Sequence, residues 1–318
     1  MRLAASIPAL GKTLAGAVER VCLAEGLGYE SVWSIQTPAG RDTAMVMAAY
    51  ASATSRIGIG TAVLPIQTRH PVAMAQMAAT LDELSCGRFH LGIGVSHPRT
   101  VEEMWRLAPA PPLETIREYL SILRSSLHDG KVDFSGRHFA ARLEYTVAAR
   151  PRLPLLIGAV GPRMLELAGE LADGVLLWLC TPSYIRTQVI PHLTIGRQRA
   201  GLPLDGFEII AMVPVSVTSD LDAGRADLRK SVNHYLTLPY YRRMLSASGF
   251  TGEVERGEWS DFMLSQISGF GTEKAVRETL RRYAAAGCTL PAAWPIEGFR
   301  GAAGVQPTLE AAAPLLLE

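Results

Sequence analysis

Apolar runs and segments of helical periodicity alternate from one end of the chain to the other. Short runs rich in β-branched residues are typical of strands, whereas apolar residues spaced by three and four positions indicate helices. The strand-like runs are 3–7, 31–33, 57–64, 88–95, 155–159, 175–179, 207–217 and 289–296. Helical spacing follows over 12–27 and 42–54, after Pro71, over 114–127 and 164–171, and from about Ser183, Asp220 and Thr272.

This alternation predicts an α/β fold, a closed (β/α)8 TIM barrel rather than a doubly wound sheet. The strands are continuous apolar runs, as expected of parallel strands buried on both faces. We predict one domain over residues 1–318. Residues 237–270 do not fit the repeat, and we expect them to form an inserted lid or substrate loop before the last helix and strand.

The composition indicates a large core and little net charge. Hydrophobic residues make up 48% of the 318 residues and charged residues 19%, which suits buried strands and a chain that hides further surface in an oligomer. The formal net charge is +1 without runs of like charge, so neither nucleic acid nor an anionic membrane is a predicted partner. No apolar run approaches the length that spans a membrane.

The cysteines argue against a metal site. Cys22, Cys86, Cys180 and Cys288 lie far apart and form no C-x-x-C pair, so neither a zinc site nor a disulfide framework is indicated, and we predict no bound metal. Free thiols favour a reducing compartment, and the N-terminus has too short an apolar run for a secretory signal. We therefore expect a soluble, cytoplasmic protein.

Candidate chemistry is expected where the strands end, because barrels of this kind carry their active sites at the C-terminal strand ends. Each strand contributes the residues that directly follow it. They are Gln36, Arg41 and Asp42 after the second strand, Ala62, Val63 and Leu64 at the third, Ser96 and His97 after the fourth, Val160, Gly161, Pro162 and Arg163 after the fifth, and Trp178, Cys180 and Tyr184 at or after the sixth.

The turn at 158–163 leads directly from a strand into a helix. Its glycines allow an anion to approach the backbone, and the N–H groups of the first helical turn point at it. Pro162 removes no useful donor there, and Arg163 adds charge. Two interpretations stand from these residues alone, a phosphate-binding turn and an ordinary β-to-α turn.

Three stretches carry a resemblance to a known family: RIGIGTAVLP, RHPVAMAQMAATLDELSCGRFHLGIGVSHP and PLLIGAVGPRMLELAGELADGV. They are similar to the bacterial luciferase-like monooxygenase superfamily, and within it to the branch that depends on coenzyme F420 more than to the FMN monooxygenases. The similarity covers about residues 2–236 and 272–297. Its most specific motifs stand here at residues 85–89 and 161–174.

The resemblance implies a homodimeric barrel that holds a reduced cofactor in its mouth and donates hydride from it, or activates oxygen when the cofactor is FMN. It also implies a bulge with a non-prolyl cis peptide at Ala62–Val63, behind the central ring of the cofactor. We accordingly predict cofactor contacts from the strand ends listed above, with coenzyme F420 as the expected cofactor and FMN as the alternative. These residues are Ala62, Val63, Leu64, Ser96, Val160, Gly161, Pro162 and Arg163.

The chain departs from that family at its proton-handling groups. Many relatives carry a histidine after the second strand and a glutamate after the fourth, but here Gln36 and the pair Ser96 and His97 stand in those places. A glutamine orients groups by hydrogen bonds and does not transfer protons at neutral pH, whereas a histidine does. We predict Gln36 and His97 as the catalytic residues, with His97 as the proton donor.

Several candidates have a purely structural alternative. His97 stands where it can cap the next helix, and His70 where it can anchor a helix start. Asp42 is either an N-cap paired with Arg41 or a cofactor ligand, and Trp178 either lines the pocket or packs in the core. Cys180 is predicted to be a small packed residue, and the insertion aromatics either cover the substrate or pack on helix faces; they are Tyr240, Tyr241, Trp259 and Phe262.

Three functions follow as hypotheses. The first is an F420-dependent oxidoreductase that transfers a hydride between the deazaflavin and a small organic substrate with a C=C, C=N or C=O bond. The second is an FMN-dependent monooxygenase, which needs a dry pocket. The third is a flavin-binding protein without turnover, favoured by the missing histidine and glutamate.

Overall fold

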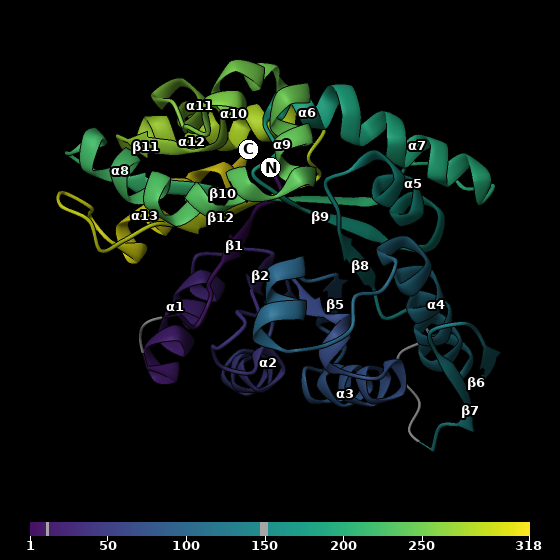
Figure 1. Ribbon diagram of the computed structural model, residues 1–318. Coiled ribbons are helices and arrows are strands. Elements are labelled where there is room, and N and C mark those ends of the chain that lie inside the picture. Colours follow the sequence, from purple (N-terminus) through teal and green to yellow (C-terminus); the bar gives the residue numbers. More distant parts are fainter. Residues whose placement is uncertain (11–12, 147–151) are drawn as a thin grey trace.

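Eight parallel strands close a barrel within residues 1–10, 13–146 and 152–318, the part of the chain that the computed structural model describes (Figure 1). Each strand pairs with the next, and the last pairs with the first. In order they are β1 (Ala4–Ser6), β2 (Ser31–Ser34), β3 (Gly58–Thr61), β5 (Phe89–Gly94), β8 (Leu155–Gly158), β9 (Gly174–Trp178), β10 (Glu208–Val217) and β12 (Leu290–Pro295). The predicted (β/α)8 TIM barrel is confirmed.

Helices follow the strands around the outside. They are α1 (Leu14–Gly26), α2 (Thr43–Ala53), α3 (Pro71–Leu84), α4 (Pro112–Arg124), α5 (Pro162–Leu171), α6 (Pro182–Tyr184), α7 (Ile190–Arg199), α8 (Leu221–Val232), α12 (Glu273–Ala285) and α13 (Val305–Ala312). Periodicity predicted each helical region except α13, and residue 12, where the first prediction began, lies outside the described residues. Thr272 caps α12 by accepting from the Ala275 N–H, and His70 caps α3 by accepting from the Val72 N–H, as its alternative role as a helix anchor predicted.

A hairpin between α4 and β8 was not predicted. Its strands, β6 (Lys131–Ser135) and β7 (Ala140–Glu144), pair antiparallel and lie away from the barrel sheet (Figure 1). The Glu118 carboxylate of α4 accepts hydrogen bonds from the backbone N–H groups of residues 137–139, which lie at the hairpin's tip. This contact fastens the hairpin to the outside of α4.

The segment predicted as an insertion is largely helical. Between α8 and α12 the chain forms η5 (Asn233–Thr237), α9 (Pro239–Leu245), η6 (Ser246–Phe250), α10 (Thr251–Arg256), α11 (Asp261–Ile267) and β11 (Gly269–Gly271). β11 extends the sheet by pairing with the end of β10, and Trp259, Met263 and Leu264 are buried. Residues 237–270 therefore form a packed helical layer on the barrel rather than an open loop (Figure 1).

Glycines make room for the side chains that fill the barrel. A Cβ on Gly60 would lie 2.4 Å from the Trp33 ring, and one on Gly92 would lie 1.9 Å from the Thr61 carbonyl oxygen. The interior cluster around Trp33 consists of Ala4, Leu156, Leu176, Ile210, Met212, Leu290 and Ala292, with Ala62, Val63, Trp178 and Trp294 packed against it. The barrel is thus a filled core whose upper rim is formed by residues of β9, β12 and the chain after β3.

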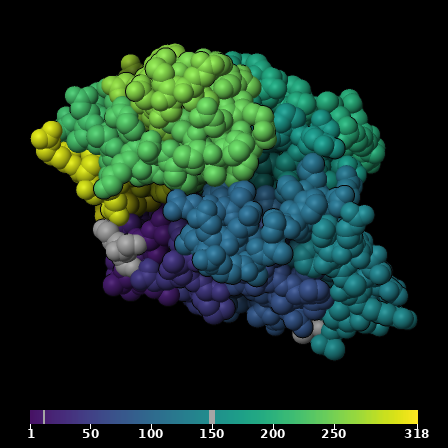
Figure 2. All heavy atoms as spheres, viewed as in Figure 1, coloured from purple at the N-terminus to yellow at the C-terminus, as the bar shows by residue number. Residues whose placement is uncertain are grey.

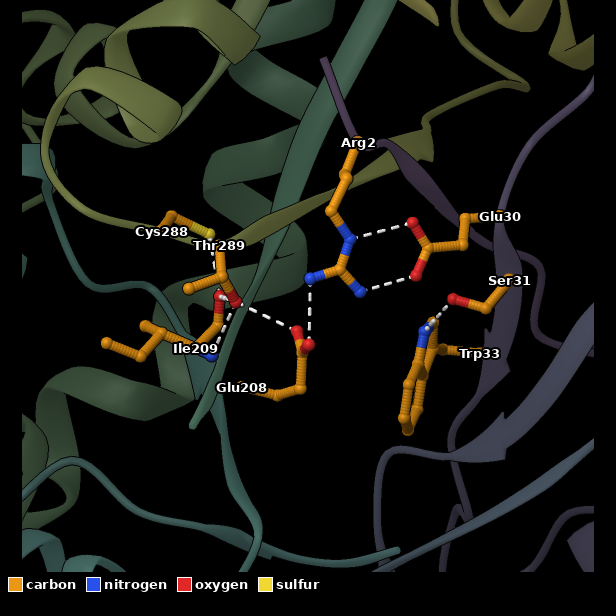
Figure 3. Close-up of polar contacts among 8 residues, drawn as sticks. All are labelled: Arg2, Glu30, Ser31, Trp33, Glu208, Ile209, Cys288 and Thr289. Carbon is orange, nitrogen blue, oxygen red and sulfur yellow. Dashed lines mark hydrogen bonds and ion pairs between the residues drawn. The ribbon is translucent and has the colours of Figure 1, made fainter. Parts of the chain in front are cut away.

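Polar side chains close the N-terminal end of the barrel (Figure 3). Arg2 forms an ion pair with Glu30, with Nε 2.8 Å from Oε2, and a second with Glu208, with Nη1 2.8 Å from Oε1. Glu208 also accepts from the Thr289 hydroxyl at 2.9 Å. These contacts link the starts of β1, β2, β10 and β12, which lie beside one another in the barrel.

The family-like motif at residues 85–89 has a structural role here. The Arg88 guanidinium donates to the carbonyl oxygens of Ala51, Thr54 and Ile57, and so holds the end of α2 and the start of β3. Cys86 adopts a left-handed backbone conformation with φ 54°, which favours glycine. This motif therefore shapes the N-terminal side of the barrel and lies outside the expected site.

Candidate functional site

The chain after β3 forms a bulge at the mouth, by which we mean the C-terminal end of the barrel. The Ala62–Val63 peptide bond is cis, as predicted. Both residues are partly exposed, and the Val63 side chain lies between Gly94 and Gly158, where an added Cβ would come within 2.8 and 3.2 Å of its methyl groups. Glycines on the two neighbouring strands therefore accommodate this bulge.

Leu64 differs from its two predecessors. It is fully buried in β4 (Leu64–Pro65), which pairs with the end of β5, and its side chain packs in the outer core. It lies behind the bulge and supports it, so its side chain does not face the mouth.

The first turn of α5 has the features of an anion site. Gly161 is the N-cap and provides no side-chain cap, and space is open around its Cα. Arg163 is exposed, has no ion-pair partner among the described residues, and borders a groove of about 380 Å³ between α4, α5 and α7. The Tyr184 hydroxyl donates to the Val160 carbonyl at 2.9 Å and holds the strand end in place. Free N–H groups, small residues and an unpaired guanidinium fit a phosphate.

Gln36 is engaged in its own loop. Its Oε1 accepts from the Thr43 N–H at 2.8 Å, and its Nε2 donates to the carbonyls of Thr37 and Arg41 at 3.1 and 3.3 Å. All its amide hydrogens are thereby in use. The geometry supports a role in shaping the loop below the mouth, and a direct contact with substrate would require these bonds to break.

Asp42 caps α2 through the N–H of Ala44, so the structural alternative for this residue holds. Its predicted ion pair with Arg41 is wrong. Asp42 pairs with Arg69 instead, and Arg41 donates to the Ala9 carbonyl at 2.7 Å. Because a side chain points away from its sequence neighbour at a helix start, the long-range partner is the reachable one.

His97 lies in an aromatic cluster and does not cap a helix. Nδ1 of His97 bonds the hydroxyl of Tyr240, and the ring lies 5.8 to 6.3 Å from those of His234, Tyr235 and Tyr241. Burial, and secondly the charge of a protonated His234, lower the pKa of His97. Figure 2 shows the surfaces of these regions side by side, the blue segment after β5 below the green segment around α9. We call these five residues the aromatic cluster.

Trp178 joins this cluster to the barrel interior. Its ring lies 4.7 Å from that of Trp294 and 6.2 Å from that of Tyr235. The next residue, Leu179, has a left-handed φ of 58°, an unusual conformation for leucine that turns the chain sharply after β9. Cys180 is buried as predicted, and its carbonyl accepts from the Tyr283 hydroxyl.

Sequence reasoning missed Trp294, His234 and Tyr235. Trp294 lies near the end of β12, the eighth strand, where the strand-end rule was not applied, so its signal was available. His234 and Tyr235 lie in η5, beyond α8, and no strand-end signal points to them. Of the insertion aromatics, Tyr240 and Tyr241 join the cluster, while Trp259 is buried in the core and Phe262, although 64% exposed, packs against Phe250.

The mouth also contains an unsatisfied hydroxyl. Ser6 ends β1, is 1% exposed, and its Oγ has no hydrogen-bond partner among the described residues. The Ser96 N–H bonds the side chain of Gln67 at 3.3 Å. A buried hydroxyl without a partner is uncommon and marks a position where a bound molecule can supply one.

Comparison with known proteins agrees with this geometry. The model of the luciferase-like monooxygenase family matches residues 1–290. The chain belongs to this family. The protein is an oxidoreductase. The resemblance drawn from the motifs is confirmed.

Individual relatives add detail. This chain is 32% identical over 234 residues to a Mycobacterium tuberculosis protein provisionally named a coenzyme F420-dependent oxidoreductase. The matched region covers 69% of this chain and 67% of that one. The fold of this chain matches the coenzyme F420-dependent tetrahydromethanopterin reductase of Methanopyrus kandleri, with TM-score 0.79, 21% identity and 98% of each chain covered. It also matches an F420-dependent secondary alcohol dehydrogenase, with TM-score 0.80, 19% identity and coverage of 92% and 93%.

No helix among the described residues is long and apolar enough to cross a membrane. The described residues also contain no group of three histidine, cysteine, aspartate or glutamate side chains that could hold a metal ion.

Proposed function

We propose that this enzyme is a coenzyme F420-dependent oxidoreductase that transfers a hydride between the reduced deazaflavin and a small organic substrate with a C=C, C=N or C=O bond. The observation that carries the proposal is the uncapped first turn of α5 together with the cis peptide at the partly exposed residues Ala62 and Val63. The names of the relative and the structures described above support the choice of cofactor.

When bound, the cofactor supplies the hydride. Ala62 and Val63 would support its ring, with Leu64 behind them, and Ser96 would contribute a hydroxyl. The α5 turn would hold its phosphate; this turn comprises Val160, Gly161, Pro162 and Arg163. His97 gives a proton to the substrate, and Gln36 positions the loop at 37–43.

We further propose that the chain is one domain, that it acts as a homodimer in the cytoplasm, and that residues 237–270 serve as its lid. The contact of Tyr240 with His97 supports the last point, because it joins this segment to the mouth.

An FMN-dependent monooxygenase is the second candidate. The family description and the closely packed aromatic cluster favour it, since a reactive oxygen adduct needs a site without water. A flavin-binding protein without turnover is the third hypothesis, and a single reducible substrate that is turned over excludes it.

Separate titrations with coenzyme F420 and FMN, followed by the absorbance of the bound cofactor, test the proposal. We expect saturable binding of coenzyme F420 and weaker binding of FMN, and then oxidation of reduced coenzyme F420 by substrate without oxygen. Riboflavin, which lacks the phosphate of FMN, is the matched probe for the α5 turn and should bind more weakly than FMN. Activity that requires both FMN and oxygen would overturn the proposal.

A further inference from the structure

His97 and Tyr240 form the polar contact between the end of β5 and α9. The Tyr240 hydroxyl bonds Nδ1 of His97, and the two rings stack with centroids 6.0 Å apart and planes 23° apart. Within the described residues, no second hydrogen-bond partner is found for the Tyr240 hydroxyl, and none for Nε2 of His97.

The direction of this hydrogen bond follows from the strength of the two groups as donors and acceptors. A neutral imidazole has one N–H and one acceptor nitrogen, and a phenol has one proton to donate. In either direction one hydrogen is left without an acceptor among the described residues. Because a phenol is a stronger donor than the N–H of a neutral imidazole, and an imidazole nitrogen is a stronger acceptor than a phenol oxygen, the favoured arrangement has the phenol donating to Nδ1 and the imidazole hydrogen on Nε2.

The surroundings keep both groups uncharged. Burial lowers the pKa of His97. It raises the pKa of Tyr240 and that of Tyr235. Burial also lowers the pKa of His234. The rings that enclose His97 are thus neutral, and none of them offers a charge to a carboxylate or phosphate.

We propose that Tyr240 is a positioning residue that holds His97 as the Nε2–H tautomer, so that the mouth offers one uncharged N–H donor to a neutral carbonyl or imine acceptor of the substrate. This rests on the proposed function for the reaction itself. This proposal gives residues 237–270 a role in the reaction, because α9 supplies the hydroxyl that fixes the tautomer of His97, which follows β5.

The proton balance is closed by the same pair. As hydride adds to the acceptor carbon, the acceptor oxygen or nitrogen takes the Nε2 proton. In the same step the Tyr240 proton moves to Nδ1 and the Tyr240 oxygen takes a proton from water, so no phenolate is left and His97 remains a neutral imidazole with its hydrogen on the other nitrogen. Before the next turnover His97 returns its Nδ1 proton to solvent as Nε2 is protonated.

The tautomer is measurable without any cofactor. Imidazole ¹⁵N chemical shifts of the full-length, ¹⁵N-labelled protein distinguish the two neutral tautomers, and the His97 signals are identified by their loss in His97→Asn. We expect the Nε2–H pattern in the wild type and a mixture of tautomers in Tyr240→Phe. Tyr145→Phe removes a buried hydroxyl from the chain after β7, away from the mouth, and should leave the His97 signals unchanged.

Turnover supplies the second readout. Tyr240→Phe should lower kcat about 10-fold or more with little change in cofactor affinity, and should have no further effect in a His97→Ala background. An Nδ1–H pattern in the wild type, or identical His97 spectra in wild type and Tyr240→Phe, would overturn the proposal. Failure of the protein to bind coenzyme F420 would overturn the proposed function instead. The tautomer measurement needs no cofactor and would still test the role of Tyr240.

Discussion

The two ends of the barrel differ in whether their polar groups have partners. At the N-terminal end, Arg2 bridges Glu30 and Glu208, and Glu208 also receives the Thr289 hydroxyl (Figure 3). At the C-terminal end, the first turn of α5 is uncapped and the Ser6 hydroxyl has no partner among the described residues. Partnered polar groups stabilise a fold, whereas groups awaiting partners suit a ligand, so changes at one end should affect stability and changes at the other should affect reaction and binding.

The largest effect is expected at His97. His97→Ala removes the proposed proton donor and should lower turnover by about 10²–10⁴-fold while cofactor affinity remains nearly unchanged. Steady-state kinetics and cofactor titration measure the two quantities. His70→Ala is the control, since it removes a helix cap at a cost of about 1 kcal/mol in the free energy of unfolding and should keep the rate. A His97→Ala variant with normal turnover and reduced stability would assign His97 a structural role only.

Arg163 should control binding rather than chemistry. Arg163→Glu places a negative charge on the first turn of α5 and should weaken cofactor binding about 10-fold at low salt, through the helix terminus and the lost charge pairing. Isothermal titration at two salt concentrations measures this effect. Lys230→Glu, a matched charge reversal on exposed α8, should leave affinity unchanged. Equal affinity of Arg163→Glu and wild type would place the phosphate elsewhere.

Arg2 should behave in the opposite way. Arg2→Ala removes two ion pairs whose arginine side chain is 47% exposed, so we expect a loss of only about 1 kcal/mol in the free energy of unfolding and no change in turnover. Urea denaturation and kinetics on the same sample test both statements. A fall in kcat without a fall in stability would erase the proposed difference between the two ends.

Two cysteines offer a pair of changes with opposite signs. Cys86 has a left-handed φ, so Cys86→Gly should relieve strain and stabilise the fold by up to about 1 kcal/mol. Cys22 is exposed within α1, so Cys22→Gly should destabilise the fold by about 1 kcal/mol. Thermal unfolding of both variants is the measurement, and a shift of the same sign in both would contradict this prediction.

The smallest effect is a change in pH dependence. Burial is the larger cause that lowers the pKa of His97, and the charge of a protonated His234 is the second. As the pH falls, His97 therefore stays neutral at pH values below the ordinary pKa of histidine. His234→Asn removes the second cause, and the pKa of His97 should rise while staying under the control of burial. The acid limb of turnover and the NMR titration of His97 should therefore both move to higher pH. A downward movement would show that His234 acts on His97 by another route.

Much of the fold followed from local pattern. Parallel strands buried on both faces must be apolar throughout, so 155–159 and 207–217 were recognisable without any partner. The hairpin at 131–144 escaped because its strands are short, half polar and held by a distant carboxylate, Glu118. The last helix, α13, has a periodic face that was left out of the prediction.

The sequence by itself determined the barrel, the family and the strand ends where chemistry is expected, because burial patterns and backbone requirements are local properties of the chain. Only the tertiary structure decided which side chains meet. The partner of His97 is Tyr240, 143 positions away, and that of Asp42 is Arg69 rather than Arg41. Such contacts depend on how helices cross and strands close, since a side chain reaches only a few ångströms and its neighbours in space are set by packing of the whole barrel.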